Sequence, residues 1–109
     1  MKRVLLDQGA PVPLREHLTD HLVDTAFQRG WSTLKNGELL AEAERAGYSV
    51  LVTTVKNLRH QQNLTGRSIA IVVLGTTSWP RLRLFVDEIT LAIESSVPGG
   101  YVELDIKTA

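Results

Sequence analysis

The most constraining feature of the sequence is an uninterrupted apolar run, Ile69–Leu74, which lies between Ser68 and Gly75. No polar residue alternates with the apolar ones, so neither face of such a strand is suited to water. Continuous apolar strands are typical of parallel sheets that have helices on both faces. The run therefore predicts a central strand of a layered α/β fold.

Four further segments are candidates for strands. Arg3–Leu6 is a short apolar run that stops at Asp7-Gln8-Gly9, and Tyr48–Thr54 is an apolar run that leads into a polar segment. Tyr101–Ile106 alternates between apolar and polar residues, which indicates a half-exposed edge strand. Residues 22–27 fit either a short strand or a continuation of the preceding helix, and we favour the strand.

Helices are expected between these strands. Prolines suit a first helical turn, so Pro11 and Pro13 are expected to open a helix. Leu14, Leu18 and Leu22 are apolar residues spaced by four and would share one face of this helix. Asn36 is expected to cap a second helix, which ends at Gly47. A short helical turn is expected over residues 56–63. Pro80 is expected to open a long amphipathic helix, with Leu82, Phe85, Ile89 and Ile93 on its apolar side.

Alternating strands and helices predict an α/β fold, a three-layer α/β/α sandwich with a mostly parallel sheet of four to five strands. The chain of 109 residues suits a single domain, 1–109. It has no cysteine, which excludes disulfides and zinc–thiolate sites and fits a reducing cytoplasm. Its 12 basic and 12 acidic residues balance, so any attraction of nucleic acid must be local. No apolar stretch approaches the roughly 20 residues of a membrane span, so no membrane partner is expected.

Two acidic residues are candidates for a metal site. Asp7 follows the first strand, and the ends of the strands at Thr54-Val55 and Gly75-Thr76 are expected at the same edge of a parallel sheet, where ligands bind in open α/β folds. Glu38 lies in the first turn of a helix that is expected to start near that edge. Two carboxylates could hold Mg²⁺ or Mn²⁺, with neutral oxygen donors from Thr54, Asn57, Thr76 and Ser78. Equally, Asp7 could close a turn and Glu38 could complement a helix dipole.

A basic, amide-rich segment follows the third apolar run. Cationic side chains contact phosphates without reading sequence, so the segment is a candidate RNA-binding surface; its residues are Lys56, Arg59, His60, Gln61, Gln62 and Asn63. Arg81, Arg83 and a base stacked on Trp79 would extend it. The alternative is an ordinary solvated helix, with Trp79 packed as an apolar plug.

The ordered set of motifs resembles the PIN-like ribonuclease-toxin families. The resemblance starts at Asp7-Gln8-Gly9-Ala10-Pro11, continues through Asn36-Gly37-Glu38-Leu39-Leu40 and the segment 52–64, and ends with the strand at 69–74. It implies a PIN-like fold with an acidic cluster that binds Mg²⁺ or Mn²⁺, and an RNA-cutting toxin paired with an antitoxin protein. By this comparison Asp7 is the first metal ligand and Glu38 belongs to the acidic motif at a helix start.

The sequence departs from the family's third motif, which normally reads Thr-x-Asp with a further acid two residues later. Val55 and Asn57 stand at these places. Valine cannot bind a metal, and asparagine can do so only through a neutral carbonyl, so divalent binding is expected to weaken. Two interpretations follow: a ribonuclease of reduced activity, with Asp7 and Glu38 catalytic, or an inactive domain that binds RNA or a protein. A third is an interaction module that forms a homodimer through the edge strand 101–106.

Overall fold

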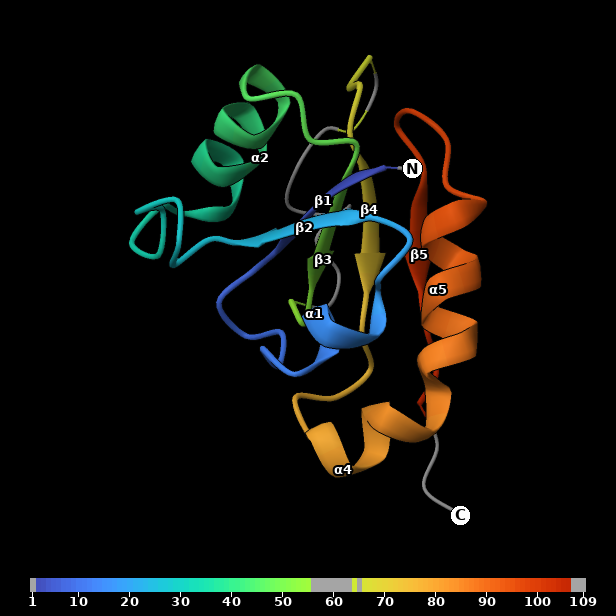
Figure 1. Ribbon diagram of the computed structural model, residues 1–109. Coiled ribbons are helices and arrows are strands. Elements are labelled where there is room, and N and C mark those ends of the chain that lie inside the picture. Colours follow the sequence, from blue (N-terminus) through green and yellow to red (C-terminus); the bar gives the residue numbers. More distant parts are fainter. Residues whose placement is uncertain (1, 56–63, 65, 107–109) are drawn as a thin grey trace.

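The fold is described from a computed structural model that describes residues 2–55, 64 and 66–106. Figure 1 shows a central sheet with helices packed on both faces. All strand pairs are parallel, and the strand order is β2-β1-β3-β4-β5. The strands are β1 (Arg3–Leu6), β2 (Leu22–Thr25), β3 (Val50–Thr53), β4 (Ala70–Val73) and β5 (Tyr101–Glu103). The predicted three-layer α/β/α fold with a mostly parallel sheet is confirmed.

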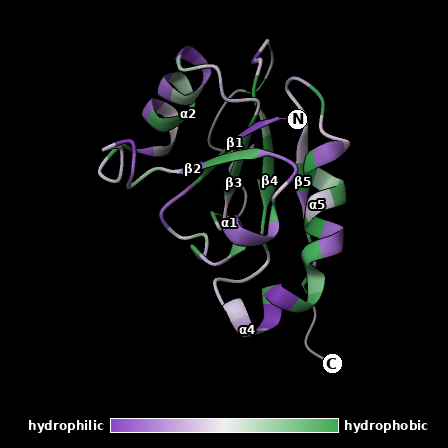
Figure 2. Cartoon of the chain, viewed as in Figure 1, coloured by the Kyte–Doolittle hydropathy of each residue, from purple (hydrophilic) through white to green (hydrophobic). Residues whose placement is uncertain are grey.

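The three inner strands are apolar on both faces, as their sequences require (Figure 2). Their alternate residues belong to two separate core clusters, one on each side of the sheet. One cluster joins the sheet to the helical segments 14–17, 79–82 and 86–94 and includes Leu6, Leu14, Val52, Leu82 and Ile89. The other joins the sheet to the helix before β3 and includes Leu5, Leu39, Leu40, Leu51 and Ile71. The two clusters explain why the inner strands lack polar alternation.

The helices are α1 (Leu14–His17), α2 (Asn36–Arg45), α4 (Trp79–Leu82) and α5 (Val86–Glu94), with a 3₁₀ turn, η1 (Arg83–Phe85), between the last two. Helix α2 covers one face of the sheet, and α1, α4 and α5 cover the other. Among the described residues, no helix is both long and apolar enough to cross a membrane.

Two predictions about the first helix and the strand that follows it have different outcomes. The short strand favoured for residues 22–27 is confirmed as β2. The placement of Leu22 on the helix face with Leu14 and Leu18 is wrong, because α1 ends at His17 and Leu22 opens β2 with a side chain that is 55% exposed. The His21 N–H donates to the Leu18 carbonyl, so a turn replaces the next helical turn.

The other helix predictions need smaller corrections. Helix α2 begins at Asn36 rather than after it, with Lys35 in the capping position, and Gly47 follows its end at a φ of 88°. The long helix predicted from Pro80 starts at Trp79 and is interrupted by η1; Leu82, Ile89 and Ile93 are buried and Phe85 is half-buried. The predicted edge strand is confirmed as β5, whose Val102 and Glu103 are exposed. The helical turn predicted over residues 56–63 lies outside the described residues.

Candidate functional site

Asp7 lies at the carboxyl end of β1 and is held by both neighbouring segments. Its backbone N–H donates to the Val52 carbonyl at 2.8 Å, which extends the pairing of β1 with β3. One carboxylate oxygen, Oδ1, accepts the Gln8 N–H at 2.7 Å, and the other, Oδ2, accepts the Thr53 hydroxyl at 2.7 Å. A carboxylate has about four lone-pair positions. Each oxygen of Asp7 therefore keeps acceptor capacity for a ligand.

Thr53 connects Asp7 to the end of β3. Its side chain is fully buried. The hydroxyl oxygen that donates to Asp7 also accepts the Val55 N–H at 3.1 Å. Position 55 is thus joined to the carboxylate of Asp7 through one buried hydroxyl. The ends of β1 and β3 meet here, as the parallel topology predicted.

Gly9 brings the same two segments into close contact. A Cβ atom at Gly9 would lie 2.3 Å from Oγ1 of Thr54, which no side chain can occupy without displacing the threonine. The turn itself is closed by the Ala10 N–H, which donates to the Asp7 carbonyl at 3.0 Å. Glycine is therefore needed so that the loop after β1 can lie against the end of β3.

Asp7 opens into a hollow of about 320 Å³ at the carboxyl ends of β1 and β2. Its size lies at the lower end of the range for small-molecule sites. The hollow combines one carboxylate with one guanidinium, two carboxamides and an exposed aromatic ring; it is lined by Asp7, Gln8, Ala10, Val12, Arg15, Thr25, Phe27 and Gln28. Arg15, Phe27 and Gln28 belong to no sequence motif. Arg15 comes from α1, whereas Phe27 and Gln28 come from the turn after β2.

Glu38 lines a different hollow. Its side chain is exposed in the first turn of α2, beside a depression of about 390 Å³ that is also lined by Trp31, Leu34, Ala41, Glu42 and Arg45. Within the described ranges, no three histidine, cysteine or acidic residues form a group that could hold a metal ion. Asp7 is the one carboxylate among the described residues that line its hollow, and the Thr53 hydroxyl bonded to it is fully buried. A single carboxylate offers little charge to a divalent ion, and affinity for hard cations follows ligand charge.

Val55 is half-buried against the core cluster on the α2 side of the sheet, which also contacts Trp31 and Leu34. A valine fits this apolar surface without loss of hydrogen bonds. The predicted RNA-binding residues Lys56, Arg59, His60 and Gln61, and the candidate ligand Asn57, lie outside the described residues. Their roles remain predictions.

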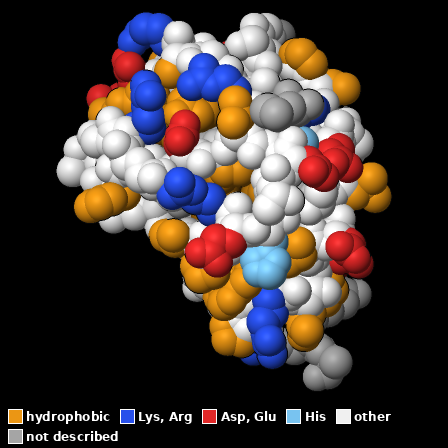
Figure 3. Space-filling view, viewed as in Figure 1, with side chains coloured by type: hydrophobic (Ala, Val, Ile, Leu, Met, Phe, Trp, Pro, Cys, Tyr) orange, Lys and Arg blue, Asp and Glu red, His pale blue; other side chains and the backbone are white. Residues whose placement is uncertain are grey.

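The polar residues at the end of β4 form a turn of their own. The Ser78 N–H donates to Oγ1 of Thr76 at 3.1 Å. Trp79 is half-buried against the core, with its ring centroid 5.2 Å from that of His17. The packing role given as the alternative for Trp79 agrees with this position. Basic and acidic side chains are interspersed over the face shown in Figure 3, in keeping with a balanced charge.

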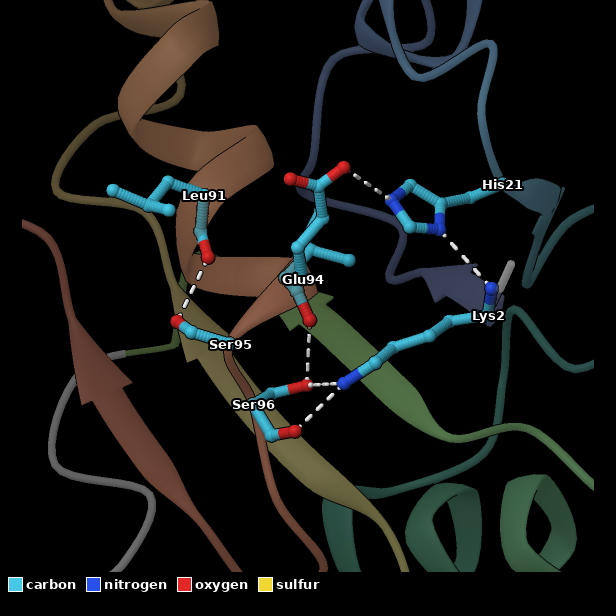
Figure 4. Close-up of polar contacts among 7 residues, drawn as sticks. Lys2, His21, Leu91, Glu94, Ser95 and Ser96 are labelled. Carbon is cyan, nitrogen blue, oxygen red and sulfur yellow. Dashed lines mark hydrogen bonds and ion pairs between the residues drawn. The ribbon is translucent and has the colours of Figure 1, made fainter.

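A second polar cluster, shown in Figure 4, lies at the opposite edge of the sheet, where β1 and β2 begin. The Lys2 ammonium donates to the carbonyl and the hydroxyl of Ser96, at 2.6 and 2.9 Å. The Lys2 backbone N–H donates to Nδ1 of His21 at 3.1 Å, and Nε2 of His21 lies 3.7 Å from the Glu94 carboxylate. These contacts fasten the start of β1 to the end of α5. They lie at the amino end of β1, whereas Asp7 lies just after its carboxyl end.

The chain has no significant match among protein-family models, curated proteins or solved structures. A function must therefore be inferred from the residues of this chain and from the geometry around Asp7.

Proposed function

We propose that this protein is a PIN-like, metal-dependent endoribonuclease of the toxin type, with a weakened metal site. The observation that carries the proposal is the fixed carboxylate of Asp7 at the carboxyl edge of a parallel sheet, where open α/β folds bind ligands. The hollow beside it adds the guanidinium of Arg15 and the carboxamides of Gln8 and Gln28, which are groups that contact nucleic acids.

Asp7 would be the main ligand of Mg²⁺ or Mn²⁺. The family resemblance implies Asn57 and Glu38 as further ligands, although Glu38 lines a separate depression in this structure. A bound divalent ion would lower the pKa of a coordinated water and neutralise charge on the phosphate under attack. The contribution of the chain itself is to hold the Asp7 carboxylate in one orientation through Gln8 and Thr53. The RNA backbone would be held by Lys56, Arg59, His60 and Gln61.

The same proposal implies a cytoplasmic protein that is controlled by a cognate antitoxin protein. Both follow from the family resemblance, and the lack of cysteine agrees with a reducing compartment.

The proposal is tested with purified protein, single-stranded RNA and either Mg²⁺ or Mn²⁺. The Asp7→Asn variant keeps the shape of the side chain but removes its charge, so cleavage should fall by at least tenfold. Asp20→Asn, an exposed charge change in the turn before β2, is the matched control and should cleave like the wild type. Undiminished cleavage by Asp7→Asn would rule out the role given to Asp7.

A second candidate function is a PIN-like domain that no longer cleaves and binds RNA or a partner protein. The apolar surroundings of Val55 favour it, because the position expected to carry a metal ligand packs instead against the core on the α2 side. Val55→Asp restores the carboxylate next to the Thr53 hydroxyl, and Val55→Asn provides the same shape without charge. Cleavage and Mn²⁺ binding that appear only with Val55→Asp would favour this second function. Strong cleavage by the native sequence would exclude it.

A further inference from the structure

Phe27 lines the hollow that contains Asp7. Its side chain is 77% exposed, which exceeds the exposure of every other large apolar side chain in the described part of the chain. Phenylalanine is normally buried, because its ring offers a large apolar surface and no polar atom for water. An exposed ring beside a mostly apolar hollow that also carries a carboxylate and a guanidinium therefore needs an explanation other than core packing.

The turn that carries Phe27 is tightly bonded. Thr25 and Gln28 exchange hydrogen bonds: the Thr25 N–H donates to Oε1 of Gln28 at 2.9 Å, and the Gln28 N–H donates to Oγ1 of Thr25 at 3.0 Å. The Ala26 N–H donates to the Leu6 carbonyl, and the Gly30 N–H donates to the Phe27 carbonyl. The backbone on both sides of the ring is thus fixed to β1 and to its own turn. Phe27 is held outward by the fold.

Besides the ring, the hollow carries one cation, Arg15, one carboxylate, Asp7, and the two carboxamides of Gln8 and Gln28. Arg15 is exposed, and its guanidinium has no hydrogen-bond or ion-pair partner within the described residues. The Gln28 carboxamide oxygen accepts from Thr25, and its two amide N–H groups have no partner within the described residues, so they can donate to a ligand. A ligand for this hollow should therefore offer a flat apolar face, acceptors at its edge and a negative charge.

We propose that this hollow binds one nucleotide of single-stranded RNA, with its base stacked on Phe27 and its phosphate contacted by Arg15. The proposal rests on the function proposed above, since it takes RNA as the ligand, and it adds where an unpaired nucleotide is held. The Gln28 amide contacts acceptors on the base edge. Stacking on an aromatic ring tolerates any base, so the site selects unpaired nucleotides more than sequence.

The test is fluorescence anisotropy with a short labelled RNA in EDTA, so that binding is measured without cleavage. Phe27→Ala should weaken binding by roughly 5- to 140-fold, since stacking contributes roughly 1–3 kcal/mol per base. Phe27→Trp should restore binding. Leu84→Ala, which removes another side chain that is 72% exposed, is the matched control and should bind normally.

Two further arms identify the contacts. An RNA with abasic positions should bind the wild type and Phe27→Ala equally, because no base remains to stack. In a plot of log affinity against log salt concentration, Arg15→Gln should reduce the slope by about one, the contribution of one phosphate contact. Lys35→Gln changes an exposed lysine outside the hollow and should leave the slope unchanged. An unchanged affinity of Phe27→Ala, or failure of the wild type to bind RNA, would overturn the proposal. In that case a protein partner is the better occupant.

The two proposals fail separately. RNA binding that depends on Phe27 in a protein that cannot cleave would leave the stacking site standing and exclude the ribonuclease. Cleavage that is unaffected by Phe27→Ala, with unchanged affinity, would leave the ribonuclease standing and exclude the stacking site.

Discussion

The hydroxyl of Thr53 donates a hydrogen bond of 2.7 Å to Oδ2 of Asp7 between two adjacent strands, β3 and β1. The same hydroxyl accepts the Val55 N–H, so one buried side chain connects the carboxylate at the end of β1 with the backbone at position 55. The orientation of the Asp7 carboxylate is thus determined by the core of the protein. This relationship gives the candidate site a rigid centre.

Thr53→Val should destabilise the fold by about 1–3 kcal/mol, because the Val55 N–H and the Asp7 carboxylate each lose a buried partner. Thr53→Ser is the matched control: it keeps the hydroxyl and loses a methyl group, which costs about 0.8 kcal/mol. Urea denaturation of the wild type, Thr53→Val and Thr53→Ser measures how far each substitution lowers the free energy of unfolding. If the valine variant were as stable as the serine variant, the hydroxyl would have no structural role.

Gly9→Ala should destabilise the fold by about 1–3 kcal/mol, the usual cost of an added methyl group in a packed site. The new Cβ would meet Oγ1 of Thr54 at 2.3 Å. Thr54→Ala removes that oxygen, so the double variant should be more stable than the sum of the single changes predicts. Strict additivity in a thermal-unfolding double-mutant cycle would show that the two loops do not touch.

Tyr48→Phe should cost about 1–2 kcal/mol near neutral pH, because the buried phenol donates to Oδ2 of Asp24 at 2.6 Å. Burial and the hydrogen bond to Asp24 raise the pKa of Tyr48. A group whose folded pKa is raised stabilises the protein below its ordinary pKa, and this stabilisation is lost as the pH rises through the folded pKa. The wild type should therefore lose stability in alkali more steeply than Tyr48→Phe.

Unfolding measured from pH 8 to strongly alkaline solution, together with tyrosinate absorbance, checks this behaviour. Tyr101→Phe serves as the control, since that phenol bonds to Glu103 on the exposed edge strand. Equal alkaline slopes for the wild type and Tyr48→Phe would contradict the assignment of the shifted pKa to Tyr48.

Much of the fold was predictable because the apolar runs of β1, β3 and β4 require burial on both faces of the sheet. The parallel strand ends followed from the alternation of strands and helices. The interruption at η1 was not predictable, because the apolar spacing of Leu82, Ile89 and Ile93 continues through it. The helix face given to Leu22 failed because a spacing of four does not reveal where a short helix ends.

The candidate site was only partly predictable. Asp7 stood out as an acid directly after a strand, but Thr54 was chosen as the neighbouring oxygen donor instead of Thr53. Successive side chains of a strand point to opposite faces, so the choice depends on the pairing of β1 with β3, which the sequence does not give. Arg15 and Phe27 share a hollow with Asp7 through turns far apart in sequence, and no local pattern indicates that contact.

Glu44→Gln should destabilise the protein near neutral pH by less than about 1 kcal/mol, and the difference should disappear in acid. Glu44 pairs with Arg67 and accepts the N–H and the hydroxyl of Ser68. Burial alone would raise the pKa of Glu44, but these hydrogen bonds together lower it. A lowered folded pKa gives stability above the ordinary carboxyl pKa, and this stability is lost as the pH falls through the folded value.

Urea denaturation of the wild type and Glu44→Gln, repeated from neutral to acidic pH, measures the closing of this difference. Glu42→Gln is the matched control from the same helix, because Glu42 pairs with the exposed Arg45 one turn away. Its effect should be small at every pH, since an exposed ion pair contributes little. A constant difference between Glu44→Gln and the wild type across this pH range would show that the ionised carboxylate does not hold α2 to the start of β4.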